Sequence, residues 1–307
     1  MPKRIDETFA SVTGETLDLK IWQPDGDARA IVQIVHGMAE YIDRYDEVGR
    51  YLAENGCLAI GHTHLGHGPR AKTKGYFGER DGWQHLLDDA CRAREIAAGR
   101  YAGLPVFLLG HSMGSFVARC LLMDHGGMYQ GAILSGTGYF APGKVLGGKA
   151  IARLQCLFGQ GKKPSPLINQ IGFATANRPF APARTEFDWL SRDPARVNKY
   201  AADPYCGHLF TAKGYGGLFD GLNRLNRLDD LKRMPKELPV LFISGASDPV
   251  GDMGRGVRTI AAQFRAAGLS DVTVRLYDGA RHELFNEINR EEVFGDLLSW
   301  IGAHVPA

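Results

Sequence analysis

Apolar and polar positions along the chain follow two alternating periods, one typical of strands and the other of helices. Residues 16–22 alternate apolar with polar side chains, which predicts a half-exposed antiparallel strand. Apolar runs of the kind found in buried strands occupy 31–35, 57–60, 104–109, 131–135, 239–243 and 272–277. Helical spacing of apolar residues follows at 41–52, 84–98, 116–121, 257–267 and 293–301. This alternation favours an α/β fold with a mostly parallel central sheet and helices on both faces.

One segment interrupts this rhythm. From about Ala141 to Gly217 the chain is rich in proline, glycine and aromatic residues and shows no clear buried strand. We therefore expect residues 1–140 and 217–307 to form the core domain. Residues 141–216 are expected to form an inserted cap, or lid, over the carboxyl edge of the sheet.

Composition and charge exclude several classes of protein. A chain of 307 residues with 44% hydrophobic and 23% charged residues can bury a large core without disulfides or metals. Its net charge of +2, with no block of Lys and Arg, gives no reason to expect nucleic-acid binding. No apolar run reaches the ~18 residues of a transmembrane span, and the first residues lack a signal segment. Five scattered cysteines without a C-x-x-C pair predict reduced thiols and a cytoplasmic location.

The most specific chemical signal is the sequence Gly-His-Ser-Met-Gly at residues 110–114, which lies between an apolar run and a helical pattern. A Gly-x-Ser-x-Gly turn between a strand and a helix is typical of the nucleophile elbow of a serine hydrolase. The turn is so tight that a Cβ at either flanking glycine would collide with a neighbouring element. We therefore predict that Ser112 is a nucleophile that forms a covalent ester with an acyl group.

A serine nucleophile needs a base, and the base needs a group that orients it. In open α/β sheets such groups lie on loops that leave the carboxyl ends of strands. Asp248 and His282 both follow predicted strands, and the order Ser112, Asp248, His282 is the one expected of an α/β-hydrolase. Asp252 and Asp278 remain alternative acids, and a loop aspartate can also serve only as a helix cap.

Acyl transfer also requires two N–H donors for the oxyanion of the tetrahedral intermediate. We expect one to be the amide of Met113, the residue after the nucleophile. The other is expected at Met38, in the His-Gly-Met sequence that follows the predicted strand at 31–35. Gly37 allows the chain to turn there, so that this amide points into the site.

Three histidines in a glycine-rich loop, His62, His64 and His67, raise a different hypothesis, a metal-dependent hydrolase. In the His-x-His-x-Asp-His pattern of such enzymes an acid stands where this chain has Gly66, and the sequence shows no comparable second cluster of ligands. We therefore expect no metal and no other cofactor, with these histidines in supporting hydrogen bonds.

Taken together, these residues make the chain resemble the bacterial monoacylglycerol lipase and lysophospholipase branch of the α/β-hydrolases. The resemblance rests on residues 36–40, Arg44, Tyr45, 66–68, 75–77, 110–114, 187–193, 203–207, 248–251, 280–284, Asn286 and Glu287. It implies that Ser112 is the nucleophile, His282 the base and Asp248 the orienting acid. Met38 and Met113 would supply the oxyanion donors.

The substrate is less constrained by the residues. Among the aromatic side chains of the inserted segment, Phe173, Phe180 and Trp189 are candidates for lining an acyl-binding tunnel, and a small core of the cap itself is the alternative. The resemblance implies a small ester with one fatty chain, such as a monoacylglycerol or lysophospholipid, and is compatible with transient contact with a membrane surface. A short-chain carboxylesterase, a peptidase and a non-catalytic ligand-binding relative remain alternatives. The sequence predicts no oligomeric state.

Overall fold

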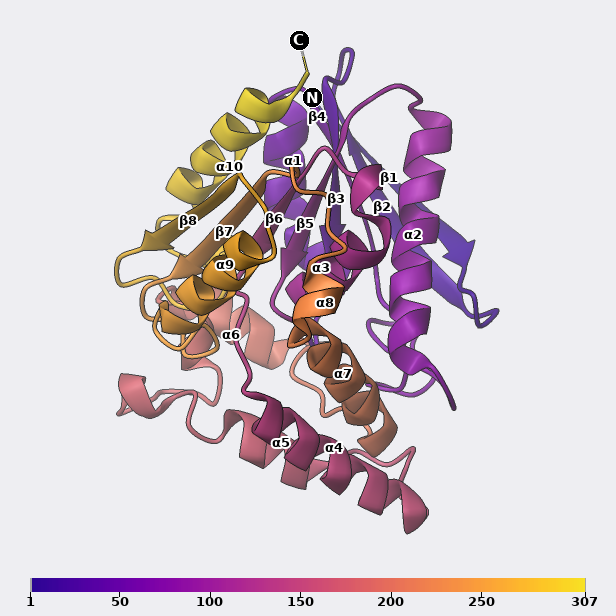
Figure 1. The fold of residues 1–307 in the computed structure, drawn as a ribbon, viewed down its shortest axis with the longest axis vertical. Helices are drawn as coiled ribbons and strands as arrows, with labels where there is room; N and C mark the ends of the chain where they lie inside the picture. Colours follow the sequence, from indigo (N-terminus) through magenta and orange to yellow (C-terminus); the bar gives the residue numbers. More distant parts are fainter. Residues whose placement is uncertain (1, 307) are drawn as a thin grey trace.

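The computed structural model describes residues 2–306 and places an eight-stranded sheet at their centre (Figure 1). Across the sheet the strands stand in the order β1-β2-β4-β3-β5-β6-β7-β8. β2 runs antiparallel to both of its neighbours, whereas β3 to β8 pair in parallel. The strands are β1 (Lys3–Ala10), β2 (Thr16–Gln23), β3 (Ala30–Val35), β4 (Cys57–His62), β5 (Val106–His111), β6 (Gly131–Ser135), β7 (Val240–Gly245) and β8 (Val272–Tyr277).

The predicted α/β fold is confirmed, with two differences on the antiparallel side of the sheet. The sequence pattern does not predict β1, whose side chains are half-buried or exposed. β2 is buried on both faces rather than half-exposed. On its polar face Trp22 packs in one core cluster with Val48 of helix α1. Lys20 is tolerated there because its ammonium lies 3.0 Å from the carboxylate of Asp6 on β1.

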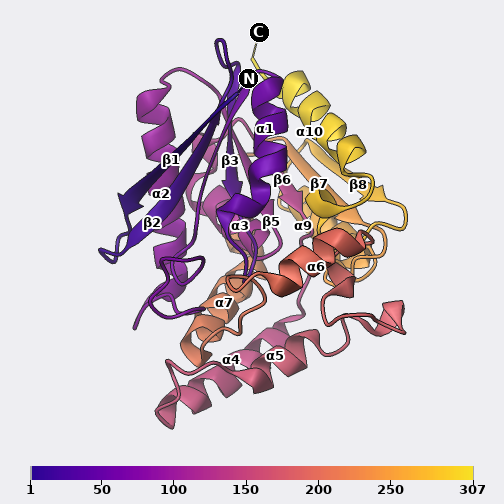
Figure 2. The same cartoon turned by 180° about the vertical axis from the view of Figure 1, so that it is seen from behind.

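Helices cover both faces of the sheet, as the alternating pattern predicts. α1 (Asp46–Glu54) and α10 (Arg290–His304) pack on one face (Figure 2). α2 (Gly82–Arg100), α3 (Met113–His125) and α9 (Arg255–Ala266) pack on the other (Figure 1). Each group buries its apolar side against the sheet, and this burial supplies the main driving force for the layered arrangement.

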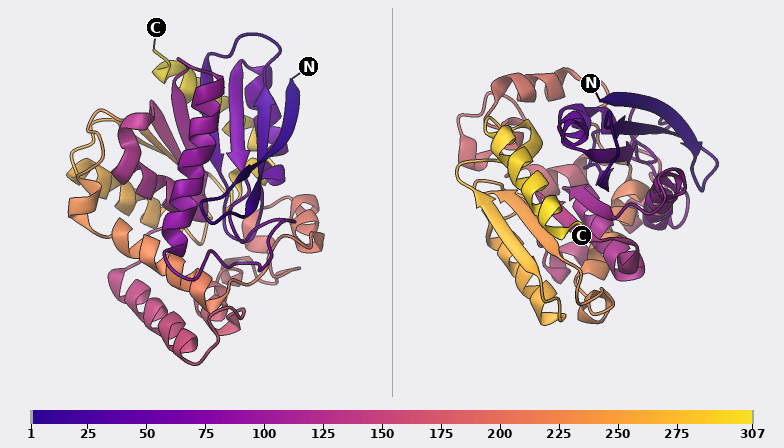
Figure 3. Two further views of the ribbon diagram at one scale, coloured as in Figure 1. Left: turned by 90° about the vertical axis from the view of Figure 1, so that its right-hand side faces the viewer. Right: turned by 90° about the horizontal axis from the view of Figure 1, so that it is seen from above.

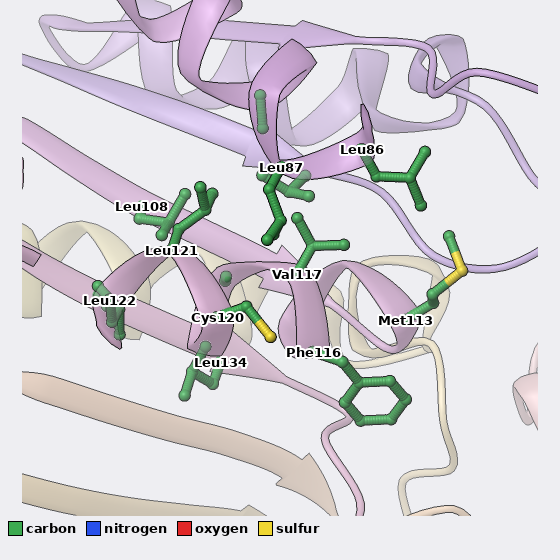
Figure 4. Packing of buried hydrophobic residues seen from close by; sticks show 14 of the residues in the cluster. Leu86, Leu87, Leu108, Met113, Phe116, Val117, Cys120, Leu121, Leu122 and Leu134 are labelled. Carbon is green, nitrogen blue, oxygen red and sulfur yellow. The ribbon is translucent and has the colours of Figure 1, made fainter. Parts of the chain in front are cut away.

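The core around α3 fixes the element that follows the predicted elbow (Figure 4). Val117 and Leu121 of α3 are fully buried, in one cluster with Leu87 of α2, Leu108 of β5 and Leu134 of β6. A helix that is apolar on nearly all sides belongs inside a domain, between other elements. The start of α3 is therefore held rigidly against the carboxyl end of β5.

The segment at 141–216 lies at the end of the molecule where the parallel strands terminate (Figures 1 and 3). It contains α4 (Pro142–Leu157), α5 (Pro166–Phe173), α6 (Pro194–Ala202) and the start of α7 (Ala212–Leu225), and no strand. α7 continues past residue 216 and packs on α4 as well as on α2 and α3 of the core. It is followed by the short α8 (Leu228–Leu231), and 3-10 turns occupy Ile42–Tyr45, Gly126–Met128, Arg178–Phe180, Asp188–Leu190 and Leu284–Asn286.

Among the helices in the described part of the chain, none has both the length and the apolar character required to span a bilayer.

Candidate active site

Ser112 occupies a strained turn between β5 and α3. Its backbone has φ of +52° and ψ of −120°. Residues other than glycine rarely adopt a positive φ. The flanking glycines allow the close approach that this turn needs. A Cβ on Gly114 would lie 2.0 Å from the carbonyl oxygen of Val35 on β3, and one on Gly110 would lie 2.5 Å from the carbonyl oxygen of Gly114.

Three side chains from distant parts of the sequence meet at this turn. Nε2 of His282 lies 2.9 Å from Oγ of Ser112, and Nδ1 of His282 lies 3.0 Å from both carboxylate oxygens of Asp248. Asp248 follows β7 and His282 follows β8, so the carboxyl ends of parallel strands bring them together. Asp252 instead pairs with Arg255 on the surface, at 2.8 Å. The arrangement provides a route for a proton between the Ser112 hydroxyl and the imidazole.

The buried carboxylate controls the charge of the imidazole. Asp248 is fully buried and also accepts hydrogen bonds from the Val250 N–H, at 2.8 Å, and the Ser244 hydroxyl, at 3.3 Å. Burial by itself lowers the pKa of His282, but the charge of Asp248 and its hydrogen bond outweigh that effect and raise this pKa above its ordinary value of 6.5. The imidazolium that results from proton uptake is therefore stabilised.

The two residues predicted to donate to the oxyanion both lie next to elements that contact the serine. Met113 is the first residue of α3. The first N–H groups of a helix have no partner within the helix, and the helix dipole favours negative charge at this end. Met38 lies in the loop after β3, and a Cβ on the preceding Gly37 would approach Cβ of Ser112 to 3.2 Å. Within residues 2–306 neither methionine N–H donates to another protein group, so both are available to an incoming oxygen.

A pocket of about 400 Å³ opens beside Ser112 and His282, and residues of the segment 141–216 line its other side. Phe173 and Trp189 line it, as the sequence suggests, and the Trp189 ring lies 5.0 Å from the His282 ring. Phe180 does not line the pocket, because its ring lies beneath the Arg281 guanidinium, 4.0 Å from it.

Sequence reasoning missed the polar part of this pocket. Asn169, Gln170, Asn177 and Glu186 contribute to its wall. They carry no motif and no periodic signal, so only the path of the chain through the inserted segment shows that they face the site.

His62 at the end of β4, and His64 and His67 in the loop after it, form a buried cluster of neutral imidazoles. His64 donates its backbone N–H to Nε2 of His36 at 2.9 Å, and the rings of His62 and His64 lie 4.9 Å apart. Burial lowers the pKa of His62 to about 3 and holds those of His64 and His67 well below 6.5. In the described range 2–306, no group of three or more His, Cys, Asp or Glu side chains is arranged to hold a metal ion.

Comparison with known proteins finds a matching family and several relatives. A family model described as serine aminopeptidase, S33, matches residues 26–289. A monoacylglycerol lipase of Mycolicibacterium smegmatis is 28% identical over 305 residues, with 98% of each chain covered. Monoglyceride lipase of Homo sapiens is 28% identical over 300 residues, which cover 95% of this chain and 89% of that one.

Solved structures show the same likeness in three dimensions. A thermostable carboxyl esterase from Bacillus coagulans, solved in complex with glycerol, superposes with a TM-score of 0.92 at 27% identity and 99% coverage of both chains. A soluble variant of the Saccharomyces cerevisiae monoglyceride lipase, in complex with a substrate analog, has a TM-score of 0.77 at 20% identity, covering 100% of this chain and 96% of that one. At that identity the second likeness concerns the fold alone.

The charge of Asp248 should be visible in the titration of His282. We expect the His282 ring to titrate above pH 6.5 in the unmodified protein and at lower pH in Asp248→Asn, because the amide no longer stabilises the imidazolium. NMR titration of the ring, assigned by its loss in His282→Gln, measures both values. Asp252→Asn, at a surface ion pair, is the matched control and should leave the titration unchanged. An equal His282 pKa in Asp248→Asn and the unmodified protein would contradict this account.

Proposed function

The chain belongs to the serine aminopeptidase S33 family and is a carboxylic ester hydrolase of the α/β-hydrolase fold, and we propose that it acts through a covalent acyl ester on Ser112. As substrates we propose esters with a single fatty chain, of the monoacylglycerol or lysophospholipid type. The observation that carries the proposal is the line of hydrogen bonds from Ser112 through His282 to Asp248. Ser112, at the end of this line, forms part of the wall of a pocket that is apolar on one part of its surface.

The proposed mechanism uses the same groups in both halves of the reaction. Oγ of Ser112 forms a bond to the ester carbonyl carbon while its proton passes to Nε2 of His282. Asp248 holds the ring and stabilises the imidazolium, and the amides of Met38 and Met113 hydrogen-bond the oxyanion.

Collapse of the tetrahedral intermediate breaks the bond from the carbonyl carbon to the alcohol oxygen, and His282 gives its proton to the leaving alcohol. A water molecule then attacks the acyl ester in the same way and releases the carboxylic acid. His282 thus acts first as a base and then as an acid in each half-reaction.

The apolar part of the pocket lining supports a substrate with a fatty chain. Its apolar wall is supplied largely by the inserted segment, which we propose to be a cap over residues 141–216. Phe173, Phe187, Trp189 and Leu209 form this wall, and a pocket of about 400 Å³ falls within the usual range for small-molecule sites. The relatives named for monoacylglycerol hydrolysis support the same substrate class.

A short-chain carboxylesterase is the second candidate. The Bacillus coagulans carboxyl esterase is 27% identical with 99% of both chains covered, which is close to the 28% identity and 98% coverage of the Mycolicibacterium smegmatis monoacylglycerol lipase. Acyl chain length therefore decides between the two functions.

Replacing the serine tests the covalent step. Ser112→Ala should lower kcat by several orders of magnitude, on the scale of the roughly 10⁶-fold losses known for other serine nucleophiles. It should also abolish labelling by a fluorophosphonate, which mass spectrometry locates in the unmodified protein. Ser270→Ala changes an exposed serine outside the site and should keep both activity and labelling. Labelling that persists in Ser112→Ala would refute the assignment.

A substrate series tests the acyl specificity. We expect kcat/KM to rise from two-carbon to medium and long acyl chains in p-nitrophenyl esters and in monoacylglycerols, because each added methylene that becomes buried contributes about 0.8 kcal/mol. Lysophospholipids of matched chain length measure the preference for the alcohol. A maximum at two to four carbons would instead establish the short-chain esterase, and cleavage of amino-acid amides in preference to esters would establish a peptidase.

The cap also presents the surface that we propose for contact with a lipid bilayer. Exposed apolar side chains lie on two helices of this segment. Those on α4 and at its end are Leu146, Leu154, Leu157 and Phe158, and those on α5 are Leu167 and Ile171. Leu157 and Phe158 are each 75% exposed. α5 places Phe173 in the pocket wall while it exposes Ile171, so this apolar surface adjoins the site.

Charge on the same segment favours an anionic membrane. Residues 141–185 contain seven Lys and Arg residues and no Asp or Glu, although the net charge of the whole chain is only +2. Basic side chains near an anionic lipid surface contribute about 1 kcal/mol each. The rest of the chain is acidic on balance, so attraction would orient the cap toward the lipid.

Vesicle binding tests this contact. The double variant Leu157→Ser with Phe158→Ser should bind phosphatidylglycerol-containing vesicles at least about tenfold more weakly, because two apolar side chains no longer enter the lipid. Its hydrolysis of a soluble p-nitrophenyl ester should be unchanged. Leu228→Ser with Ile288→Ser removes two exposed apolar side chains elsewhere and serves as the control. Equal vesicle binding by the first double variant and the unmodified protein would overturn the proposed surface.

A further inference from the structure

A buried ion network outside the proposed triad joins two loops of the site. Nη1 of Arg44 lies 2.5 Å from Oε2 of Glu40, and its Nη1 and Nη2 lie 2.6 Å from the two carboxylate oxygens of Glu283. The side chains of Arg44, Glu40 and Glu283 are only 12%, 4% and 6% exposed. Such a two-pronged bond between a guanidinium and a carboxylate is strong and fixes both position and orientation.

One end of this network holds the loop with the predicted oxyanion donor. Oε1 of Glu40 accepts the N–H of Gly37 at 2.5 Å and the hydroxyl of Tyr45 at 2.7 Å. Gly37 directly precedes Met38. The Glu40 carboxylate therefore fixes the peptide group immediately before the one that carries the Met38 N–H, whose own carbonyl oxygen, on Gly37, lies 2.8 Å from Nδ1 of His36.

The other end holds the segment that carries the histidine. Glu283 directly follows His282, and its N–H donates to the carbonyl oxygen of Leu190 in the inserted segment at 2.7 Å. Asn286 donates to the Glu283 carboxylate at 3.1 Å. Because Glu283 is joined to His282 by one peptide bond, the contacts that hold Glu283 also restrain the backbone that carries the imidazole.

The inserted segment closes over the same guanidinium. The ring of Tyr200 on α6 lies 4.7 Å from Cζ of Arg44, and its hydroxyl donates to the carbonyl oxygen of Ala39 at 3.1 Å. A cation over an aromatic face is favourable, and more so where water is excluded. Three separate parts of the chain thus meet at Arg44.

We propose that Arg44 is a positioning residue that couples the oxyanion loop to the base. By holding Glu40 and Glu283 at once, it fixes the distance between the Met38 amide and the His282 imidazole. The inference rests on the function proposed above and adds to it a residue that touches neither the substrate nor Ser112.

The shape of the guanidinium is essential to this role. Lysine carries the same charge but has a single ammonium group, which cannot form parallel bonds to Glu283 while also bonding Glu40. Complete removal of the charge would leave two buried carboxylates with no cation, which is strongly destabilising. Arg44→Lys is therefore the informative change, since it preserves the charge and alters only the geometry.

The network also acts on the charge state of the base. The titratable groups that act on the His282 ring are Asp248 from the turn after β7, Glu283 and Glu40, and the ring of His111 at the end of β5 lies 4.9 Å from it. After Asp248, the charges of Glu283 and Glu40 raise the pKa of His282 further. With two carboxylates and one guanidinium, the network carries a net negative charge, which favours the imidazolium.

Steady-state kinetics of Arg44→Lys test the positioning role. We expect kcat to fall about 10- to 100-fold with little change in KM, because a small misplacement of catalytic groups weakens the transition state more than substrate binding. The unfolding temperature should stay close to that of the unmodified protein. Arg100→Lys makes the same change at a two-pronged pair with Glu7 on the surface and should leave kcat unchanged.

Glu283→Gln supplies a readout that loss of stability alone would not produce. Removal of the charge lowers the pKa of His282, so the acid limb of the kcat/KM profile should move to lower pH. The positioning role is overturned if folded Arg44→Lys keeps the kcat of the unmodified protein, or loses activity only in proportion to the unfolded fraction. If the unmodified protein shows no activity that depends on Ser112, the proposed function fails instead, which separates the two outcomes.

Discussion

The hydrogen bond between the Ser112 hydroxyl and the His282 imidazole is the interaction on which the rest of the site depends. It can form only if the ends of three strands, β5, β7 and β8, meet at one edge of the sheet, and their parallel pairing through β6 ensures this. Gly114 allows α3 to approach the carbonyl groups of β3 closely enough for the sharp turn at Ser112. Burial of α3 in the core then holds that strained turn in place.

Electrostatics at the site follow from the same burial. Asp248 is fully buried, yet several donors satisfy its carboxylate, so its charge acts on His282 with little screening by water. His62 at the end of β4 and His64 in the loop after it stay neutral because burial lowers the pKa of each ring and no carboxylate among the described residues lies beside them to offset it. One imidazole is thereby prepared to take up a proton while its neighbours serve as packing, which explains why a histidine-rich sequence need not signal a metal site.

Much of the fold and part of the site were predictable because their signals are local. Buried strands and the Gly-x-Ser-x-Gly turn are written in consecutive residues, and chain order narrows the choice of acid and base. β1 escaped prediction because an edge strand with half-exposed side chains has weak periodicity. The place of Phe180 beneath Arg281, and the pairing of Arg44 with a glutamate 239 positions away, depend on tertiary packing that no local pattern encodes.

A crystal structure of the protein after reaction with a long-chain phosphonate ester would show directly whether Ser112 is the residue that forms the covalent ester. We expect a covalent bond from phosphorus to Oγ of Ser112, a phosphonyl oxygen within hydrogen-bond distance of the Met38 and Met113 amides, and an alkyl chain in the pocket beside Ser112. Phosphorus bound to another residue, or a phosphonyl oxygen turned away from both amides toward solvent, would contradict this expectation.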